Sequence, residues 1–457
     1  MLKRFSIFLF AVSALVLSSS GCSQEKLGPD PEPFPGQDSI LVILQGAESI
    51  DFSSKAEDEQ FQLSVNSVSD WHARTDADWL ILEKQDDGLV VKAERNRTLE
   101  MRQAEITVTD GVSSVRFDAT QAAGRVVVYH VDGTAMTGVS GVPARAVSEN
   151  GRYVLGFSSA GTWVCDLWTL EYVDASNTIS ISDITFYPNT ILPWAYSVSN
   201  KGVPVPNGCT ADGNTEVTYE TTVGFSTSYI IKNGVKEVLP APSATEPVVG
   251  TMVPNGGNMA WWISDDGKYI AGRHSIPRGQ VVECGWTYNE TTGQYDFAIC
   301  GEDQIILDSE EWAVRGFWVE CMSQNGKYVG GRAYGVTDES QQYPYFHDTE
   351  TGEYVILESF PDESISMVTN EGWAAIAGAL GSTRFVDLNG DRTSAISIND
   401  WLQQQFNMTD DQVAELGSTG GLMRARCINP DKTTACFAYY PDNNVQAPQW
   451  SDIITIE

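Results

Sequence analysis

The sequence predicts an all-β protein with two parts, a small N-terminal β-sandwich followed by a β-propeller. Between residues 39 and 123, short apolar strands with period-two alternation follow one another, separated by turns and without a helical stretch. From residue 140 onward one cassette recurs six times: an apolar residue, a small polar residue and a turn, usually followed by a new apolar run. Such an array of similar β units is typical of a propeller.

The first 22 residues have the pattern of an export signal. Two basic residues precede an apolar run over residues 5–17, and small residues follow up to Cys22. The run is too short to span a bilayer. A small residue before a cysteine resembles a bacterial lipoprotein signal, which implies a lipidated Cys22, although Ser19 stands where that signal usually has Leu. Plain secretion is the alternative.

The composition of the chain limits the kinds of partner that the protein is expected to bind. Residues 23–38 are rich in proline, glycine and acidic residues, which favours a flexible, solvated linker. The formal net charge of the chain is −33. Such a surface repels nucleic acid and anionic lipid headgroups, so we expect no nucleic-acid partner and contact with a membrane through the lipid anchor only.

The expected sandwich spans residues 39–123. Trp71 and Trp79 are expected to fill its core, because a tryptophan near a strand of a small sandwich is usually buried. Its clearest strands are expected at residues 61–65, 89–94, 104–111 and 115–121.

Several motifs of this region resemble, in the same order, those of the BACON domain family. They are the stretch 71–80 (WHARTDADWL), Gly88 before a strand, Asn96 followed by Arg102, the strand at 104–111, and Gln121. The resemblance implies an immunoglobulin-like sandwich at the front of an exported, glycan-handling protein of gut bacteria. It leaves two roles open for this domain, spacer and carbohydrate binder.

The remaining residues, 125–457, are expected to form the propeller. The small polar residues of the six cassettes, called anchors below, lie on average about 56 residues apart, while four short strands with turns need about 40 to 50 residues. Each interval therefore holds one blade with a loop insertion, which predicts six blades, with seven as the alternative. The anchors are Ser148, Ser199, Ser264, Ser323, Thr369 and Asn429.

Two stretches of the propeller region have distinct local patterns. The second cassette continues as VPVPNG at residues 203–208, whose prolines cannot donate to a sheet ladder, so an irregular blade is expected there. Residues 228–239 predict a hairpin with Asn233 and Gly234 at its turn. The cassette resembles exported propeller repeats of the SxDGxxxxG kind, which implies a fold and almost no function.

The ends of the propeller region predict its closure. Residues 125–131 and 449–457 both read as strands, and one of them is expected to complete the last blade and so remove exposed edges. Further outer strand pairs are expected at residues 285–299 and 345–357. Residues 398–416 predict one or two short helices, the second capped by Thr409.

The candidate site is a column of residues three positions before each anchor, on the strand expected to be innermost. A core column would stay apolar, whereas this one changes chemistry from copy to copy, as residues facing a central funnel do. A solvated channel lining without a ligand is the alternative. The column consists of Arg145, Tyr196, Trp261, Glu320, Ser366 and Arg426.

Tryptophans near these strands add a possible sugar platform. An indole face stacks on a sugar ring, while Arg and Glu side chains bond its hydroxyls. We expect most of Trp194, Trp261, Trp262, Trp312 and Trp318 to be core and one or two to contact a ligand. The candidate ligand-binding residues are Arg145, Tyr196, Trp261, Trp262, Glu320 and Arg426.

Cysteine usage leaves the pairing open. Once Cys22 is set aside, an odd number remains, so at least one is free or partnered elsewhere. Two pairs flank turns and are candidates to bridge neighbouring strands, namely Cys284 with Cys300 and Cys427 with Cys436; buried free cysteines are the alternative. The other cysteines are Cys165, Cys209 and Cys321.

The usual catalytic and metal-binding motifs are missing. The chain has four histidines and neither an HExxH pair nor a GxSxG turn, which argues against a zinc or serine hydrolase. The stretch 387–392 (DLNGDR) is similar to a calcium loop, but Arg392 and Ile398 stand where an EF-hand needs Gly and Glu. We favour a hairpin turn there and expect no metal or cofactor.

The leading hypothesis is a non-catalytic surface lipoprotein, exported and anchored at the outer membrane, whose BACON-like stalk presents a glycan-binding propeller. The family resemblance, and not the composition, points to glycan. One alternative is a protein-docking or assembly component of an envelope complex. Another is a propeller glycosidase or polysaccharide lyase, since the 61 acidic residues offer many candidate acid/base pairs.

Overall fold

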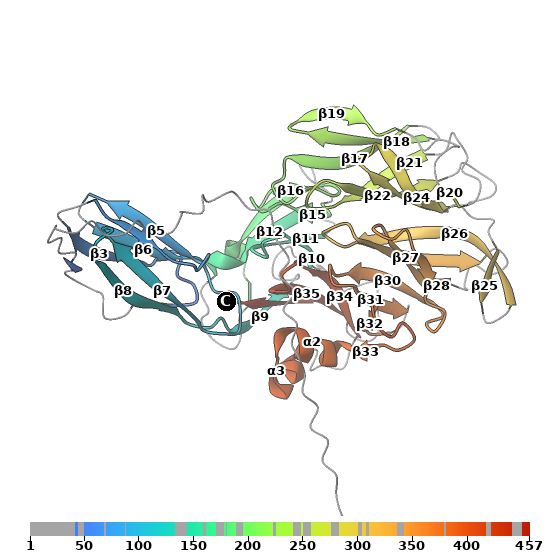
Figure 1. The fold of residues 1–457 in the computed structure, drawn as a ribbon. Coiled ribbons are helices and arrows are strands. Elements are labelled where there is room, and N and C mark those ends of the chain that lie inside the picture. The colour runs from blue at the N-terminus through green and yellow to red at the C-terminus, as the bar shows by residue number, and fades with distance from the viewer. Residues whose placement is uncertain are drawn as a thin grey trace, which may run out of the picture. The chain divides into compact units, whose positions relative to one another are not determined.

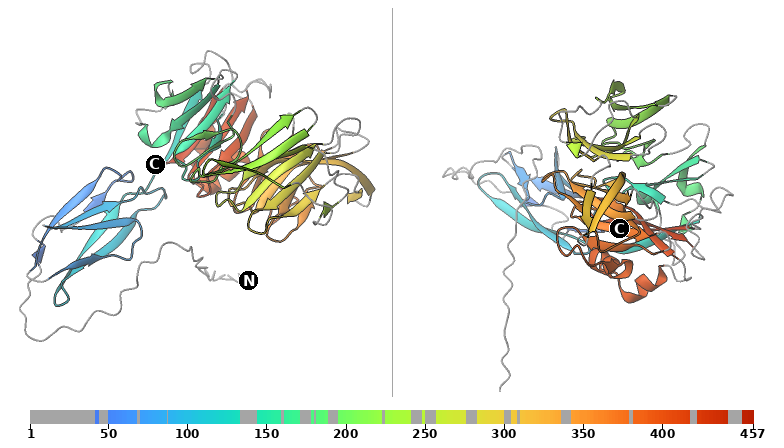
Figure 2. Two further views of the ribbon diagram at one scale, coloured as in Figure 1. Left: turned by 90° about the horizontal axis from the view of Figure 1, so that it is seen from above. Right: turned by 90° about the vertical axis from the view of Figure 1, so that its right-hand side faces the viewer.

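The chain forms two compact units (Figures 1 and 2). The smaller consists of residues 1–52, 56–94 and 103–120, and the larger of residues 53–55, 95–102 and 121–457. The structure is a computed structural model. It describes residues 42–43, 50–67, 70–86, 88–132, 144–158, 161–170, 178–179, 181–188, 195–222, 225–240, 248–249, 257–275, 283–299, 304–307, 310–335, 342–378, 381–416, 422–440 and 450–457.

The smaller unit contains two four-stranded sheets. The first has the order β1 (Val42–Ile43), β3 (Gln60–Asn66), β6 (Gly88–Ala93), β5 (Leu80–Gln85). The second has the order β2 (Ile50–Phe52), β8 (Ser114–Gln121), β7 (Arg102–Thr109), β4 (His72–Arg74). Apolar residues of both sheets share one core, and the strands predicted from alternation are confirmed. Trp71 and Trp79 lie in this core at 9% and 7% exposure, as expected.

The larger unit is a β-propeller, in which sheets of mainly antiparallel strands follow one another in chain order around a common centre (Figure 1). Its first sheet contains β10 (Ala144–Val147), β11 (Tyr153–Ser158), β12 (Gly161–Asp166) and β14 (Ile184–Pro188). Two smaller sheets follow, β15 (Ser197–Val198) with β16 (Pro204–Val205), and β17 (Thr215–Thr222), β18 (Phe225–Lys232) with β19 (Val235–Val238).

Larger sheets continue the series. The next contains β21 (Gly257–Ile263), β22 (Tyr269–Ser275), β23 (Glu283–Asn289), β24 (Gln294–Ile299) and β20 (Val248–Val249). Another contains β26 (Glu310–Met322), β27 (Tyr328–Gly335), β28 (Gln342–Asp348), β29 (Tyr354–Ile356) and β25 (Gln304–Leu307). It is followed by β30 (Glu363–Val368), β31 (Trp373–Gly378), β32 (Arg384–Asp387) and β33 (Ile396–Ser397).

The last sheet combines both ends of the propeller region. It contains β34 (Leu422–Ile428), β35 (Thr434–Tyr440), β36 (Trp450–Ile456), β9 (Val126–Asp132) and β13 (Thr178–Ile179). β36 pairs antiparallel with β9 along its whole length, from Trp450 opposite Asp132 to Ile456 opposite Val126. The predicted closure is therefore confirmed, and both expected strands take part in it.

The anchors explain why the cassette repeats. The buried Ser264 hydroxyl accepts a bond from the backbone N–H of Tyr269 at 2.9 Å and donates to the Asp266 carboxylate at 2.6 Å. Gly267 follows with φ +75°, a value that favours glycine. The hydroxyls of Ser148 and Ser323 bond in the same pattern. Each anchor thus fixes the turn between the first two strands of its sheet.

Glycines on second strands make room for tryptophans. Gly156 on β11 lies opposite Trp163 on β12, and Gly272 on β22 lies opposite Trp286 on β23. Both indoles are fully buried. A Cβ atom at either glycine would stand 2.2 Å from a ring carbon. Only a residue without a side chain fits there.

The local predictions for the propeller region hold where residues are described. The second cassette gives the short, separate β15–β16 pair, as its prolines predicted. β18 and β19 form the expected hairpin, with Asn233 and Gly234 at positive φ. The insertion contains α2 (Ile398–Phe406) and α3 (Asp410–Glu415), and Thr409 caps α3 with a complete capping box. Among the described residues, no helix has the length and apolar character to cross a bilayer.

Candidate functional site

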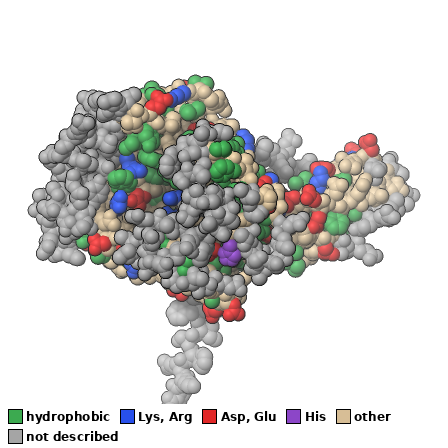
Figure 3. Space-filling model, turned by 180° about the vertical axis from the view of Figure 1, so that it is seen from behind, with side chains coloured by type: hydrophobic (Ala, Val, Ile, Leu, Met, Phe, Trp, Pro, Cys, Tyr) green, Lys and Arg blue, Asp and Glu red, His purple; other side chains and the backbone are tan. Residues whose placement is uncertain are grey.

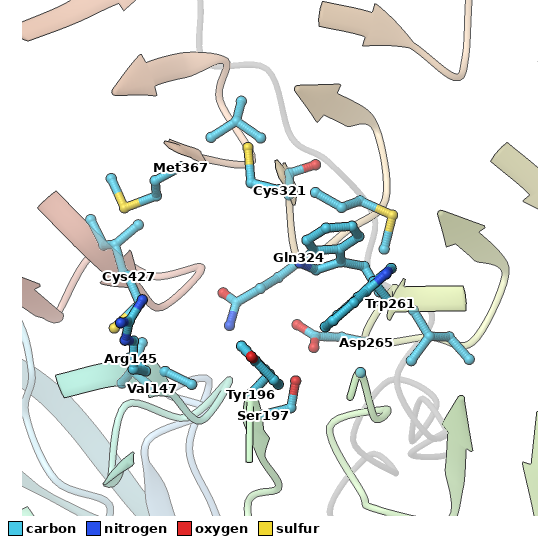
Figure 4. A pocket seen from close by; sticks show the side chains of 18 of the residues that line it. Arg145, Val147, Tyr196, Ser197, Trp261, Asp265, Cys321, Gln324, Met367 and Cys427 are labelled. Atoms are coloured by element: carbon cyan, nitrogen blue, oxygen red, sulfur yellow. The ribbon is translucent and has the colours of Figure 1, made fainter. Parts of the chain in front are cut away.

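A cavity of about 460 Å³ lies among the innermost strands of the propeller (Figure 4). Residues from β10, β15, β21, β26, β30 and β34 line it, so every cassette contributes its first strand. The cavity and the surrounding sheets define this unit as a propeller with a central recess.

The structure places the whole predicted column around this cavity. Its lining includes Arg145, Tyr196, Trp261, Glu320, Ser366 and Arg426, together with Trp262. Trp318 lines it as well. Trp194 lies outside the described residues, and Trp312 lies on β26, where its side chain is not described. The residues that the sequence selected are therefore neighbours in space.

A second row of lining residues was missed by the sequence prediction. Glu149, Asp265 and Gln324 each directly follow an anchor, and all three line the cavity. Figure 4 shows the side chains of Asp265 and Gln324 extending into the same opening. Their place in the repeat could have identified them, because the residue directly after an anchor occupies an equivalent position in every cassette, as the column residues do.

Aromatic rings form one wall of the cavity. Tyr196, which is 41% exposed, lies edge-on between Phe157 and Trp261, with ring centroids 5.4 Å from each. Tyr219 and Trp262 pack against Trp261 at 5.2 and 6.0 Å. These rings support one another, so the wall is held in place before any ligand arrives.

Arginines continue this wall. The guanidinium of Arg273 lies 5.0 Å from the Trp261 ring and 4.1 Å from the Trp318 ring. Arg332 lies 5.2 Å from the same Trp318 ring and pairs with Glu320 at 3.2 Å. Burial raises the pKa of the Glu320 carboxyl, while Arg332 opposes that shift. Indole, guanidinium and carboxyl groups thus alternate along this side.

Two arginines stand on adjacent first strands at the other side. Arg145 on β10 lies 4.9 Å from the Phe157 ring, and Arg426 on β34 lies 5.5 Å from the Tyr440 ring. Burial lowers the pKa of both guanidinium groups, that of Arg426 to about 9, and the charges of Arg145 and Arg424 contribute to the shift of Arg426. The two cations are close enough to repel each other.

An acidic group faces the same cavity. Burial raises the pKa of the Asp265 carboxyl to about 8, and the neighbouring charges of Glu149 and Asp266 add to this shift. Its backbone N–H donates to the Gln324 carbonyl at 2.7 Å, which ties two neighbouring turns together. Near neutral pH most of this group is therefore protonated and able to donate a hydrogen bond.

The described cysteines of this region are free thiols, and all of them are buried except Cys427, which is partly buried. Cys209, Cys321 and Cys427 line the cavity, and Cys427 lies directly opposite Cys436 on β35, where both are free. Burial raises the pKa of Cys209 to about 12, which leaves almost no reactive thiolate. Cys300 and Cys22 lie outside the described residues, and the side chain of Cys284 is not described. Within the described part of the chain, no cluster of three potential metal ligands occurs.

Comparisons with known proteins leave the function open. No protein-family model and no curated protein matches the chain. TolB from Acinetobacter baumannii is 11% identical over 67% of this chain and 77% of that chain, with a TM-score of 0.27. The β-propeller domain of the Trilobed protease from Pyrococcus furiosus is 8% identical over 66% and 80%, with a TM-score of 0.32.

Oligogalacturonate lyase from Vibrio parahaemolyticus is 9% identical over 73% of this chain and 98% of that chain, with a TM-score of 0.29. These TM-scores lie below 0.5. The assignment of a propeller therefore rests on the order of the sheets and on the closure by β9 and β36.

Proposed function

We propose that this protein is a non-catalytic binding protein that holds a glycan in the central cavity of its propeller. The observation that carries this proposal is the wall of Tyr196 and Trp261 beside Glu320 and the arginines, all lining one cavity. Sugar rings have one apolar face and a rim of hydroxyls, so they match aromatic rings flanked by charged hydrogen-bonding groups. A cavity of about 460 Å³ suits a short saccharide segment.

We further propose six blades. β15–β16 and β17–β19 count as two parts of one blade, because a bridge between Cys209 and Glu216 links the stretch after β16 to β17. The interrupted ladder then reflects the prolines of residues 203–208. This count gives each anchor one blade.

The proposal keeps the expected architecture of an exported lipoprotein. Cys22 carries the lipid, residues 23–38 form the linker, and the smaller unit is an immunoglobulin-like, BACON-like stalk at the outer membrane. The two four-stranded sheets with one shared core agree with such a stalk. The glycan-binding surface is then held away from the lipid.

A second candidate function is polysaccharide cleavage. It is favoured by two carboxyl groups with raised pKa in the same cavity, Asp265 and Glu320. A carboxyl that stays protonated near neutral pH is the kind of group that acts as a general acid. The binding experiment therefore includes a test for cleavage.

The experiment uses protein comprising residues 23–457 on an array of plant and host glycans, with an assay for new reducing ends and unsaturated products. Binding without cleavage supports the proposal. Trp261→Ala is expected to weaken binding at least tenfold, because it removes the centre of the aromatic wall. Phe186→Ala is the matched control, since Phe186 is an exposed ring on β14 outside the cavity lining.

Other outcomes contradict the proposal. New product ends in step with bound glycan would establish the cleavage function. If no glycan binds while envelope proteins co-purify with the full chain, the docking role replaces the glycan role. Thermal unfolding of Trp261→Ala and Phe186→Ala separates lost binding from lost folding.

A further inference from the structure

We propose that Arg145 and Arg426 together form an anion-binding site in the central cavity, so that the preferred saccharide is acidic, carrying a carboxylate or a sulfate group. This inference rests on the proposed function and names its ligand class.

The two arginines occupy equivalent positions on neighbouring strands. Each stands three residues before its anchor, Arg145 before Ser148 and Arg426 before Asn429, and both line the cavity. β10 and β34 belong to the first and last sheets, which closure makes neighbours. The charge of Arg145 acts on Arg426, so the groups share one local field. Figure 4 shows Arg145 beside Cys427, the residue after Arg426.

Neither guanidinium has a counter-ion within the described part of the chain. Their aromatic neighbours are Phe157 and Tyr440, and the Nε atom of each is buried without a hydrogen-bond partner. The two positively charged guanidinium groups repel each other. Their partial removal from water, without a carboxylate to pair with, costs further free energy. An incoming anion relieves both penalties at once.

A shortage of acidic residues in the chain does not explain why Arg145 and Arg426 have no counter-ion among the described residues. The chain has 61 acidic residues against 28 basic ones, and Figure 3 shows acidic side chains at several separate places on one face. Other arginines of the same unit are paired. Arg152 bonds Asp166 through two nitrogens at 2.7 to 3.0 Å, and Arg332 pairs with Glu320 at 3.2 Å.

The chemistry of the pair indicates the ligand. A guanidinium presents parallel N–H donors that match the paired oxygens of a carboxylate or a sulfate group. Tyr196 lies close enough to Arg145 to influence its pKa, and the Trp261 ring follows at 5.4 Å from Tyr196. A sugar ring with an acidic substituent therefore meets cations and stacking faces side by side.

The test is isothermal titration with three trisaccharides at constant ionic strength, a neutral galactan, an oligogalacturonate and a sulfated galactan. We expect at least one acidic ligand to bind 30-fold or more tightly than the neutral one. Arg145→Gln and Arg426→Gln are each expected to remove most of this preference for the acidic ligand. Arg116→Gln is the control, because Arg116 is an exposed arginine of the smaller unit.

A second measurement does not depend on saccharide binding. Sodium sulfate and sodium galacturonate are expected to raise the thermal unfolding midpoint of the wild-type chain, compared with sodium chloride at the same ionic strength. They are expected to raise it less in Arg426→Lys, because lysine keeps the positive charge but lacks the parallel N–H donors of a guanidinium group. If uronate and not sulfate binds, the ligand is a uronic acid; the reverse outcome assigns a sulfated sugar.

Two results overturn the inference. Equal affinity for neutral and acidic trisaccharides disproves the anion site while leaving glycan binding intact. Protection by free sulfate without binding of any trisaccharide disproves the saccharide ligand and the proposed function together.

Discussion

The carboxyl group of Asp265 has a pKa of about 8, against an ordinary value of 3.8, because it is buried near the charges of Glu149 and Asp266. The folded protein therefore holds this proton more tightly than the unfolded chain does. Stability gained from this group is full at low pH and is lost as pH rises from about 4 to about 8. Asp265→Asn removes that dependence.

The measurement is urea unfolding at pH 4.5 and pH 8. Between pH 4.5 and pH 8 the unfolding free energy of Asp265→Asn is expected to rise by about 1 kcal/mol or more relative to that of the wild type, because only the wild type loses the contribution of this proton. Glu149→Gln is the comparison variant and is expected to give a smaller gain, since it lowers the pKa of Asp265 by removing one charge. Parallel pH profiles for wild type and Asp265→Asn would contradict the assignment.

At the residue scale the sequence located the cavity lining through one column but not through its second row. The column was visible because Arg145, Trp261 and Glu320 differ at equivalent positions of a repeat. Asp265 and Gln324 were missed because a polar residue in a turn usually faces solvent, and only the ring brings these turns together. That Arg145 and Arg426 have no counter-ion among the residues that the structure describes is a property of the folded surroundings, which no local pattern encodes.

At the element scale, the contact of a glycine with a tryptophan on the next strand limits what each sheet accepts. Gly272→Ala is expected to destabilise the protein by about 1 to 3 kcal/mol, because its Cβ would stand 2.2 Å from the Trp286 ring within a packed sheet. Denaturant unfolding measures the loss. Gly381→Ala is the control and is expected to change stability by less than about 0.5 kcal/mol, since its nearest contact is 4.0 Å away.

If Gly272→Ala and Gly381→Ala lost the same amount of stability, the loss would come from backbone propensity and not from the clash with Trp286. The contact between Gly272 and this tryptophan was not predicted from the sequence, because cross-strand register depends on the whole sheet. By contrast, the cap at Thr409 and the turn at Asn233 and Gly234 were predicted correctly. Both depend on neighbours within a few residues.

At the scale of the whole molecule, the ring depends on its last strand. A chain lacking residues 450–457 is expected to lose cooperative unfolding and to self-associate, because β9 and β35 would become exposed edges and the buried Ile453 and Ile454 would be missing. Size-exclusion chromatography and thermal circular dichroism test this. A synthetic peptide of residues 449–457 is expected to restore a compact monomer, and a scrambled peptide is not. A cooperative, monomeric truncated chain would disprove the role of β36.

The repeat predicted the propeller, since anchor spacing is a global property that the sequence displays directly, and the strand-like ends of the region predicted its closure. The division into units was less accessible. Residues 95–102 lie within the stretch expected to be sandwich but belong to the larger unit, where Arg97 donates to the Thr434 hydroxyl at 3.0 Å. Such an association depends on residues 337 positions apart, which strand patterns do not relate.

The pairing of β9 with β36 also imposes an order on biosynthesis. Asp452 bonds His130 across 322 positions of the chain, so β9 leaves the ribosome long before its partner exists. The intermediate sheets have their strands close together in sequence and are free to form first. The cavity lining begins at Arg145 and ends at Ile428, so it is complete only after most of the chain has been synthesised. β36 follows later still, so the closed ring and its cavity are among the last features of the fold to form.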